Sequence, residues 1–232
     1  MKFYMIIMKD VYKTYSNGVT AINGINVRIE KGEFVYIVGP SGAGKSTFIR
    51  LIYREEIPTK GELIIKGIKT NEMKNKEIPY LRREIGVVFQ DFKLLPRLTV
   101  YENVAFALEV IEESPRLIRD RVMEVLELVG LKNKARSLPT ELSGGEQQRV
   151  SIARAIANQP KIVIADEPTG NLDPETSWTI MRILEEINSR GTTVIMATHS
   201  KEIVNTIKKR VIAIENGIIV RDEDQGDYGY EI

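Results

Sequence analysis

A chain of 232 residues, 43% hydrophobic and 28% charged, has the composition of a globular domain with a sizeable core. Its formal net charge of +1 supplies no overall field that would draw it to nucleic acid or to an acidic membrane. Cysteine is missing, which excludes disulfides, thiol catalysis and cysteine-ligated metals, and no apolar run approaches the ~18 residues of a membrane span. We therefore expect a cytosolic domain; if it acts at a membrane, another chain must carry the spans.

The first third of the chain is rich in predicted strands. Turn signals at Asn17-Gly18 and Lys31-Gly32 separate apolar runs that predict strands at 4–8, 25–30 and 34–38. Two more short strands are predicted at 61–67, which is bounded by glycines, and at 85–90.

The centre of the chain changes to a helical pattern. Helices are predicted over 100–113, 115–129 and about 145–158. In the second of these, Ser114 is a suitable N-cap and Gly130 a suitable end. Its apolar residues recur at helical spacing, at Ile118, Val122, Val125 and Val129.

The final third alternates between strands and helices. Strands are predicted at 161–165, 192–198, 211–215 and 218–221, with helices at 174–190 and 201–208. Because the strands are almost wholly apolar, this alternation predicts an α/β fold with a mainly parallel sheet and helices on its faces. The acidic segment 222–232 has little apolar content, and we expect it to be a flexible C-terminal tail.

The strongest chemical signal is a run of nine residues that fits the pattern G-x-x-x-x-G-K-[ST] between a predicted strand and a predicted helix. Such a turn points several backbone N–H groups at one place, and the helix N-terminus adds its dipole, so a polyphosphate can bind. Lys45 would reach the β- and γ-phosphates, and the Ser46 hydroxyl would coordinate Mg²⁺. The loop comprises Gly39, Pro40, Ser41, Gly42, Ala43, Gly44, Lys45, Ser46 and Thr47.

Polar residues also end two of the other predicted strands. Asp166 and Glu167 follow the apolar run 162–165. In a fold with a phosphate loop, Asp166 falls where Mg²⁺ and its water shell lie, and Glu167 is placed to activate the attacking water. Gln90 ends its own strand, where it could contact Mg²⁺ or the lytic water.

The helix predicted from about 145 begins in an unusual way. Ser143 and Glu146 have the spacing of a capping box, which does not by itself require the glycine pair Gly144-Gly145. Paired glycines are expected where the backbone approaches an anion closely, so we predict a second phosphate-binding helix terminus here. One nucleotide does not need two such termini from one chain. We therefore expect two chains to sandwich the nucleotide, with the loop of one facing this helix of the other.

His199 is the only histidine of the chain. It follows the strand predicted at 192–198, at the carboxyl end where ligands bind in open α/β sheets. The segment Asn171–Asp173 follows the carboxylate pair and could face the partner chain.

These residues, in this order, resemble the motifs of the ATP-binding-cassette ATPase family across nearly the whole chain. GPSGAGKST resembles the Walker A motif, IVIADE the Walker B motif and LSGGEQQR the signature motif. Gln90, Asn171–Asp173 and His199 resemble the glutamine of the Q-loop, the D-loop and the switch histidine. Tyr15 lies where the family has an aromatic residue that stacks on adenine, although packing within the β-rich region would also account for it.

The resemblance implies a P-loop NTPase fold with an antiparallel β subdomain and a small helical subdomain at about 92–145, all within a domain of residues 1–221. It implies ATP and Mg²⁺ as ligands, and ATP hydrolysis by a head-to-tail homodimer. Glu167, His199, Gln90 and Lys45 would be the catalytic residues.

Residues outside these motifs resemble the members of the family that act in bacterial cell division. The similar segments are 48–56, 81–95, 100–105 and 228–231. This resemblance implies an integral membrane partner, a place on the cytoplasmic face of the bacterial membrane, and an output that activates peptidoglycan hydrolases. We expect Phe92, Leu94 and Leu95 to dock a cytoplasmic helix of the partner; the alternative is that they belong to the core.

Two other functions remain open at the level of sequence. An ATPase subunit of a lipoprotein or drug exporter would share all of the catalytic residues. A soluble regulatory or nucleic-acid-linked ATPase is less favoured, because the net charge is near zero and the stretch between Gln90 and Ser143 is too short for a long coiled coil. We expect no nucleic-acid partner.

Overall fold

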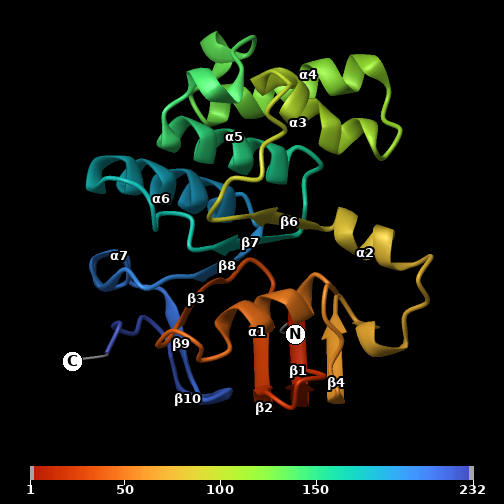
Figure 1. Ribbon diagram of the computed structural model, residues 1–232, viewed down its shortest axis with the longest axis vertical. Helices are drawn as coiled ribbons and strands as arrows, with labels where there is room; N and C mark the ends of the chain where they lie inside the picture. Colours follow the sequence, from red (N-terminus) through yellow and green to blue (C-terminus); the bar gives the residue numbers. More distant parts are fainter. Residues whose placement is uncertain (1–2, 230–232) are drawn as a thin grey trace.

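Two sheets of different kinds lie on opposite sides of helix α1 (Lys45–Ile52) in the computed structural model, which describes residues 3–229 (Figure 1). The apolar side chains of α1 are buried in one hydrophobic core with residues of both sheets. A second core fills the space between the larger sheet and the helices on its other face. Helix α1 is thus enclosed on both sides, which fixes the phosphate loop that precedes it.

The larger sheet has the strand order β10-β9-β3-β8-β7-β6. All neighbouring pairs are parallel except β9 and β10, which are joined by the turn at Asn216-Gly217. The central strands are buried on both faces, which explains their wholly apolar sequences. The strands are β3 (Phe34–Val38), β6 (Ile85–Val88), β7 (Ile162–Asp166), β8 (Thr193–Ala197), β9 (Arg210–Glu215) and β10 (Ile218–Glu223).

The smaller sheet is antiparallel, with the order β2-β1-β4-β5. Its strands are β1 (Tyr4–Thr14), β2 (Thr20–Glu30), β4 (Lys60–Ile65) and β5 (Ile68–Lys69). The first two are longer than the sequence predicts, because they continue through polar residues on the solvent face. A bulge interrupts β1 at Asp10, whose φ is 47°. A Cβ at Gly61 would collide with the carbonyl oxygen of Asp10, so the neighbouring strand needs a glycine there.

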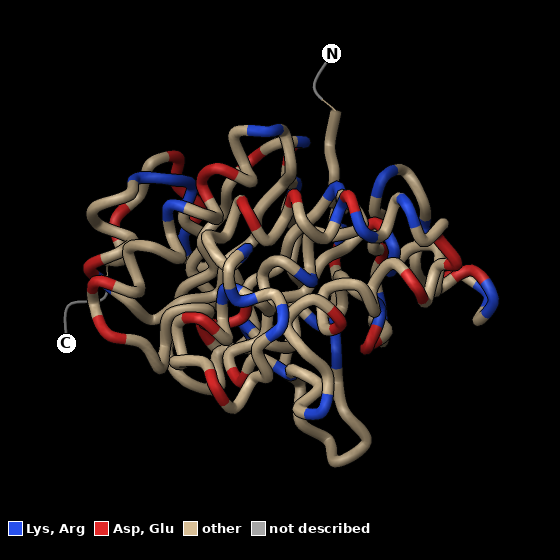
Figure 2. The backbone as a smooth tube through the Cα atoms, turned by 90° about the horizontal axis from the view of Figure 1, so that it is seen from above, with Lys and Arg blue, Asp and Glu red and all other residues tan. Residues whose placement is uncertain are grey.

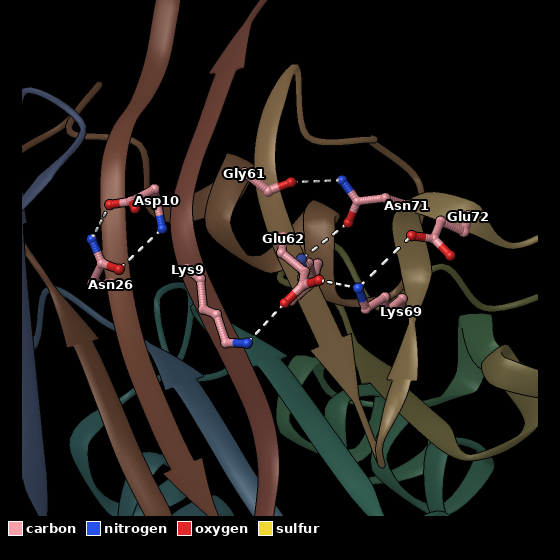
Figure 3. A network of polar contacts seen from close by, with 9 residues as sticks. Lys9, Asp10, Asn26, Gly61, Glu62, Lys69, Asn71 and Glu72 are labelled. Carbon is pink, nitrogen blue, oxygen red and sulfur yellow. Dashed lines mark hydrogen bonds and ion pairs between the residues drawn. The ribbon is translucent and has the colours of Figure 1, made fainter.

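Polar contacts tie the strands of this smaller sheet together on its outer surface (Figure 3). Glu62 of β4 lies between two cations: its carboxylate accepts from the Lys9 ammonium at 2.9 Å and also pairs with Lys69. The hydrogen bond from Lys69, followed by that from Lys9, lowers the pKa of Glu62 to about 2. Asn26 and Asp10 exchange two hydrogen bonds beside the bulge, at 2.8 and 3.0 Å. These contacts help to set the register of β1 against both of its neighbours.

Helices α3, α4, α5 and α6 lie on the face of the larger sheet opposite α1 (Figure 1). The Ser114 hydroxyl accepts from the Leu117 N–H at the start of α4, and Ile118, Val122, Val125 and Val129 are all buried, so both of these predictions are confirmed. Helix α2 was not predicted, because six residues are too short for a periodic signal. The remaining helices are α2 (Ile78–Arg83), α3 (Val100–Glu109), α4 (Pro115–Leu128), α5 (Gly144–Ile156), α6 (Pro174–Ser189) and α7 (Lys201–Thr206), with 3₁₀ turns at Thr70–Glu72, Lys132–Lys134 and Pro139–Glu141.

Charges of both signs are interspersed along the backbone (Figure 2). No helix between residues 3 and 229 is both long and apolar enough to cross a membrane.

The C-terminal segment is packed against the domain as far as the structure describes it, in contrast to the flexible tail expected from its composition. Asp222 and Glu223 extend β10, and the side chain of Tyr228 is only 7% exposed within the larger core. The Tyr228 N–H donates to Asn205 of α7 at 2.8 Å, and the Arg221 guanidinium donates to the carbonyls of Asp227 and Tyr228, each at 2.7 Å. One buried aromatic ring therefore anchors a segment that is otherwise polar; residues 230–232 lie outside the described part.

Replacement of Tyr228 by alanine tests this anchor. We expect the free energy of unfolding to fall by about 3 kcal/mol, because the truncation removes a buried aromatic ring and leaves a cavity. Thermal or urea denaturation measures the change. Tyr80, which is 65% exposed, is the matched control, and Tyr80→Ala should leave the melting temperature nearly unchanged. Equal stability of the two variants would mean that the C-terminal segment does not contribute to the core.

Candidate active site

Four adjacent strands bring the predicted site residues to one edge of the larger sheet. Because β3, β8, β7 and β6 are parallel neighbours, their carboxyl ends lie side by side. The phosphate loop follows β3, His199 follows β8, and Gln90 follows β6. Asp166 is the last residue of β7, and Glu167 comes directly after it. Strand β8 lies between β3 and β7, so the histidine comes between the loop and the carboxylates. Ligand binding at this edge is expected for an open parallel sheet.

Two glycines of the phosphate loop are required by close backbone approaches. Gly39 has φ 145° and Gly44 has φ 110°, both of which disfavour other residues. A Cβ on Gly39 would collide with the carbonyl oxygen of Ile214, and one on Gly44 with that of Ala21. Gly42, in contrast, has nothing within 4 Å of a Cβ position, so the surface of the loop is open there. The loop therefore packs closely against the backbone of other segments near Gly39 and Gly44, and it is exposed at Gly42 between them.

Lys45 lies folded into this loop, where its ammonium donates to the carbonyls of Gly39 at 2.7 Å and Pro40 at 3.0 Å. Burial lowers the pKa of Lys45, and the neighbouring charges of Glu167 and Asp166 oppose that shift. Burial, followed by the charge of Glu167, raises the pKa of Asp166, while Arg50 and Lys45 oppose it. The Lys45 ammonium on the loop and the Asp166 carboxylate at the end of β7 therefore attract each other across the site.

Glu167, His199 and Gln90 come together just beyond β7. The Glu167 carboxylate pairs with Nδ1 of His199, and its backbone N–H donates to the Ala197 carbonyl at 3.0 Å. A Cβ on Gly170 would lie 3.2 Å from Nε2 of Gln90 and 3.4 Å from Oε2 of Glu167, so both side chains reach the same spot. Glu167 has φ 49°, a left-handed conformation that costs roughly 1–2 kcal/mol for a residue with a Cβ. Such strain is concentrated at functional sites, and here it aims the carboxylate toward the histidine.

Tyr15 follows β1 and lies next to the phosphate loop. Its hydroxyl is hydrogen-bonded to the Thr47 hydroxyl at 3.1 Å, and the Lys13 ammonium lies 5.1 Å from the centre of its ring. Tyr15 is only half-buried, so part of its side chain is accessible to a ligand. This position fits the adenine contact that the sequence suggests.

The oxygen donors near the loop have the chemistry that Mg²⁺ prefers. Ser46 offers a hydroxyl, Asp166 a carboxylate and Gln90 an amide oxygen, and Mg²⁺ takes few protein ligands when substrate phosphates supply the rest. Burial, followed by the charge of Glu167, raises the pKa of Asp166, and a cation beside the carboxylate would oppose both effects. No cluster of three or more acidic or histidine side chains forms a separate metal site among residues 3–229.

The start of α5 carries the other predicted phosphate contacts. Ser143 and Glu146 form the expected capping box, with hydrogen bonds of 3.3 Å to the Ser143 hydroxyl and 2.9 Å to the Glu146 carboxylate. Ser143 and Gly144 are exposed, but no hydrogen bond links them to the phosphate loop within the described chain. This exposure suits a contact with a second molecule.

The reason for the second glycine of this pair differs from the one expected. A Cβ on Gly145 would collide with the side chain of Thr176 at the start of α6. Close packing of two helix ends therefore requires Gly145, which is buried. Only Gly144, whose Cβ position makes ordinary contacts, remains open for the approach of an anion.

One residue of this helix was missed by the sequence analysis. Gln148 is fully buried, and its amide donates to the carbonyl of Pro168 at 2.9 Å, directly after Glu167. It joins α5 to the segment that bears the carboxylates. Its place in the LSGGEQQR run could have indicated such a role, but burial cannot be read from that run.

The fold, the phosphate loop, the strand-end carboxylates and the α5 start together define an ATP-binding cassette, and comparison with known proteins agrees. The family model described as "ABC transporter" matches residues 22–170. The chain belongs to this family of ATPases.

Among individual relatives, the chain is 72% identical to the "Cell division ATP-binding protein FtsE" of Bacillus subtilis over 97% of its own length and 99% of that protein. It is 63% identical to the protein of the same description from Streptococcus pneumoniae, over 98% and 99% of the two chains. A solved structure described as a dimeric post-hydrolysis state of the ATP-binding cassette MJ0796 bound to ADP and Pi is 41% identical, with a TM-score of 0.85 over 96% of this chain and 99% of that one.

Replacement of Lys45 by alanine tests the phosphate loop. We expect the affinity for ATP to fall by about a hundredfold or more, because charge-assisted hydrogen bonds contribute about 1.5–3 kcal/mol each. Titration with a fluorescent ATP analogue measures the affinity. Lys31→Ala, at an exposed turn after β2, is the control. Its affinity for ATP should equal that of the unchanged protein. Undiminished binding by Lys45→Ala would remove the phosphate-loop assignment.

Proposed function

We propose that this ATP-binding-cassette protein hydrolyses ATP as a head-to-tail homodimer and couples hydrolysis to a membrane partner. The description of its FtsE relatives as cell division ATP-binding proteins supports a role in cell division. The observation that carries the hydrolytic part is the Glu167–His199 pair at the sheet edge that also bears the phosphate loop. The ATPase domain expected over residues 1–221 also includes the packed segment that follows as far as Tyr228, and its helical subdomain is proposed at about 92–145.

In the proposed mechanism, the loop N–H groups and Lys45 hold the phosphates and Tyr15 stacks on the adenine. Lys45 exchanges its two carbonyl acceptors for phosphate oxygens. Mg²⁺, held by Ser46, Asp166 and Gln90, would supply positive charge to the phosphate oxygens. Glu167 accepts a proton from the water that attacks the γ-phosphorus, while the bond from that phosphorus to the β–γ bridging oxygen breaks and ADP leaves. His199, between the loop and the carboxylates, holds the γ-phosphate oxygens.

The second chain completes the site in this proposal. Exposed Ser143 and Gly144 at the start of α5 contact the γ-phosphate bound by the partner's loop, and Asn171–Asp173 faces the partner. The dimeric cassette with ADP and Pi among similar structures supports this arrangement.

For the membrane partner, we propose an FtsX-like integral membrane protein docked near Phe92, Leu94 and Leu95, with this chain peripheral on the cytoplasmic face. All three side chains are half-buried. Leu94 packs against the larger core, so it presents only part of its surface to a partner. Activation of peptidoglycan hydrolases across the membrane would be the output. An exporter subunit is the rival, and the identity of the membrane partner separates the two.

Glu167→Gln tests the catalytic assignment. We expect ATP binding to persist and kcat to fall by about 100-fold or more, because a general base contributes about 10²–10⁴ to the rate. Because the bound ATP is not hydrolysed, the dimer should persist and its share should rise. Analytical ultracentrifugation with and without ATP measures that share. Normal turnover would show that Glu167 is not the base.

Leu94→Glu tests the docking site. A charge at a half-apolar contact should abolish co-purification with a co-expressed FtsX-like protein, while ATP affinity stays within about twofold. Val220→Glu on β10, where Val220 is 48% exposed, is the control that should still co-purify. The melting temperature of both variants shows whether Leu94→Glu remains folded. A folded Leu94→Glu protein that still binds the partner would place the docking site elsewhere.

A further inference from the structure

Arg154, near the C-terminal end of α5, is hydrogen-bonded to the backbone just after Gln90. Its guanidinium donates from Nη1 to the Lys93 carbonyl at 2.6 Å and from Nη2 to the Phe92 carbonyl at 2.8 Å. The side chain is half-buried and forms no ion pair with any residue in the range 3–229. The planar guanidinium presents its two donors in a fixed relative orientation, which the rotating ammonium of a lysine does not.

The backbone that Arg154 holds, at Phe92 and Lys93, adopts a conformation that is unfavourable unless other contacts stabilise it. Phe92 has φ 58° and Lys93 has φ 49°, so two adjacent residues with a Cβ are left-handed, at a cost of roughly 1–2 kcal/mol each. The turn is tight, since the Lys93 N–H donates to the Asp91 carbonyl at 2.6 Å. Strained backbone of this kind persists only when its surroundings over-determine it. The two bonds from Arg154 are the contacts that hold these two carbonyls.

The same segment touches the other end of α5. A Cβ on Gly144 would lie 3.8 Å from Cζ of Phe92, so the Phe92 ring reaches the start of the helix while its carbonyl is held near the end. Gln90 lies two residues before Phe92 and belongs to this chain's own ATP site. Ser143 precedes Gly144 and, in the proposed dimer, serves the ATP of the partner. One side chain therefore ties together two segments that act on different nucleotides.

We propose that Arg154 is a positioning residue for ATP hydrolysis, which fixes the Gln90–Leu94 segment to α5 so that Gln90 and the α5 start keep one relative placement. This inference rests on the proposed hydrolytic dimer. Arg154 contacts neither nucleotide. It acts through the segment that it holds, so its loss should slow the chemical step more than it weakens ATP binding.

Arg121 provides a matched control on a different helix. Its guanidinium also donates to two successive carbonyls, of Ala157 at 3.0 Å and of Ile156 at 3.1 Å. These carbonyls close the C-terminal end of α5, two and three residues after Arg154, and neither belongs to the Gln90 segment. Both arginines thus make the same kind of contact, and only Arg154 connects to the site.

The experiment compares Arg154→Met and Arg121→Met, which keep an apolar stem and remove the donors. For Arg154→Met we expect kcat to fall by about tenfold while KM and the affinity for a fluorescent ATP analogue stay within about twofold. For Arg121→Met we expect a lower melting temperature with kcat nearly unchanged. Hydrogen exchange of the amides at 90–95 should be faster in Arg154→Met than in Arg121→Met, because only the former frees the strained turn.

Two further variants keep the inference testable if Arg154→Met does not fold. Arg154→Lys retains the charge but not the fork, and its kcat should lie between those of the unchanged protein and Arg154→Met. Lys93→Gly removes the left-handed strain at that residue, and should restore part of the kcat lost in either Arg154 variant. An unchanged kcat in a folded Arg154 variant, or equal losses of kcat and ATP affinity in both arginine variants, would overturn the inference. Lack of ATPase activity in the unchanged protein would instead count against the proposed function.

Discussion

The parallel pairing of β3, β8, β7 and β6 is the constraint on which the rest of the molecule depends. It brings four carboxyl ends to one edge and places the phosphate loop, the histidine, the carboxylates and the glutamine in neighbouring positions. Parallel strands need covered faces, and α1 with the antiparallel sheet covers one while α3 to α6 cover the other. The architecture that buries the sheet is therefore the same architecture that leaves its polar edge open.

Helix α5 is the element through which separate parts of the site are held together. At its start Gly145 allows close contact with Thr176, at its middle Gln148 holds the Pro168 carbonyl, and near its end Arg154 holds the turn after Gln90. The three contacts join α5 to the first turn of α6, to the loop after β7 and to the loop after β6. A rigid helix with such contacts along its length moves these segments together, and its exposed start is the part that is left for a second molecule.

Backbone strain in this protein is not spread evenly. Several left-handed residues lie in ordinary turns, such as Asn216 between β9 and β10, where the conformation serves only to reverse the chain. Glu167 and the pair Phe92-Lys93 differ, because each is held by specific bonds from elsewhere. Glu167 directly follows β7, and Phe92-Lys93 lies in the loop after β6, just beyond Gln90. The cost of these conformations is offset by cross-strand and side-chain hydrogen bonds, and the result is a defined direction for the groups at the polar edge of the larger sheet.

The sequence by itself determined the features that depend on local order. The phosphate loop, the carboxylate pair and the Ser143–Glu146 cap are recognisable because glycine conformation, strand periodicity and helix capping act over a few residues. Only the tertiary structure decided that β8 separates β3 from β7, that Tyr228 is buried, that Gly145 serves packing and that Arg154 reaches the turn after Gln90. The physical reason is that burial, side-chain reach and strand order are set by residues far apart in the chain, and local pattern carries no information about which distant neighbour will cover a given side chain.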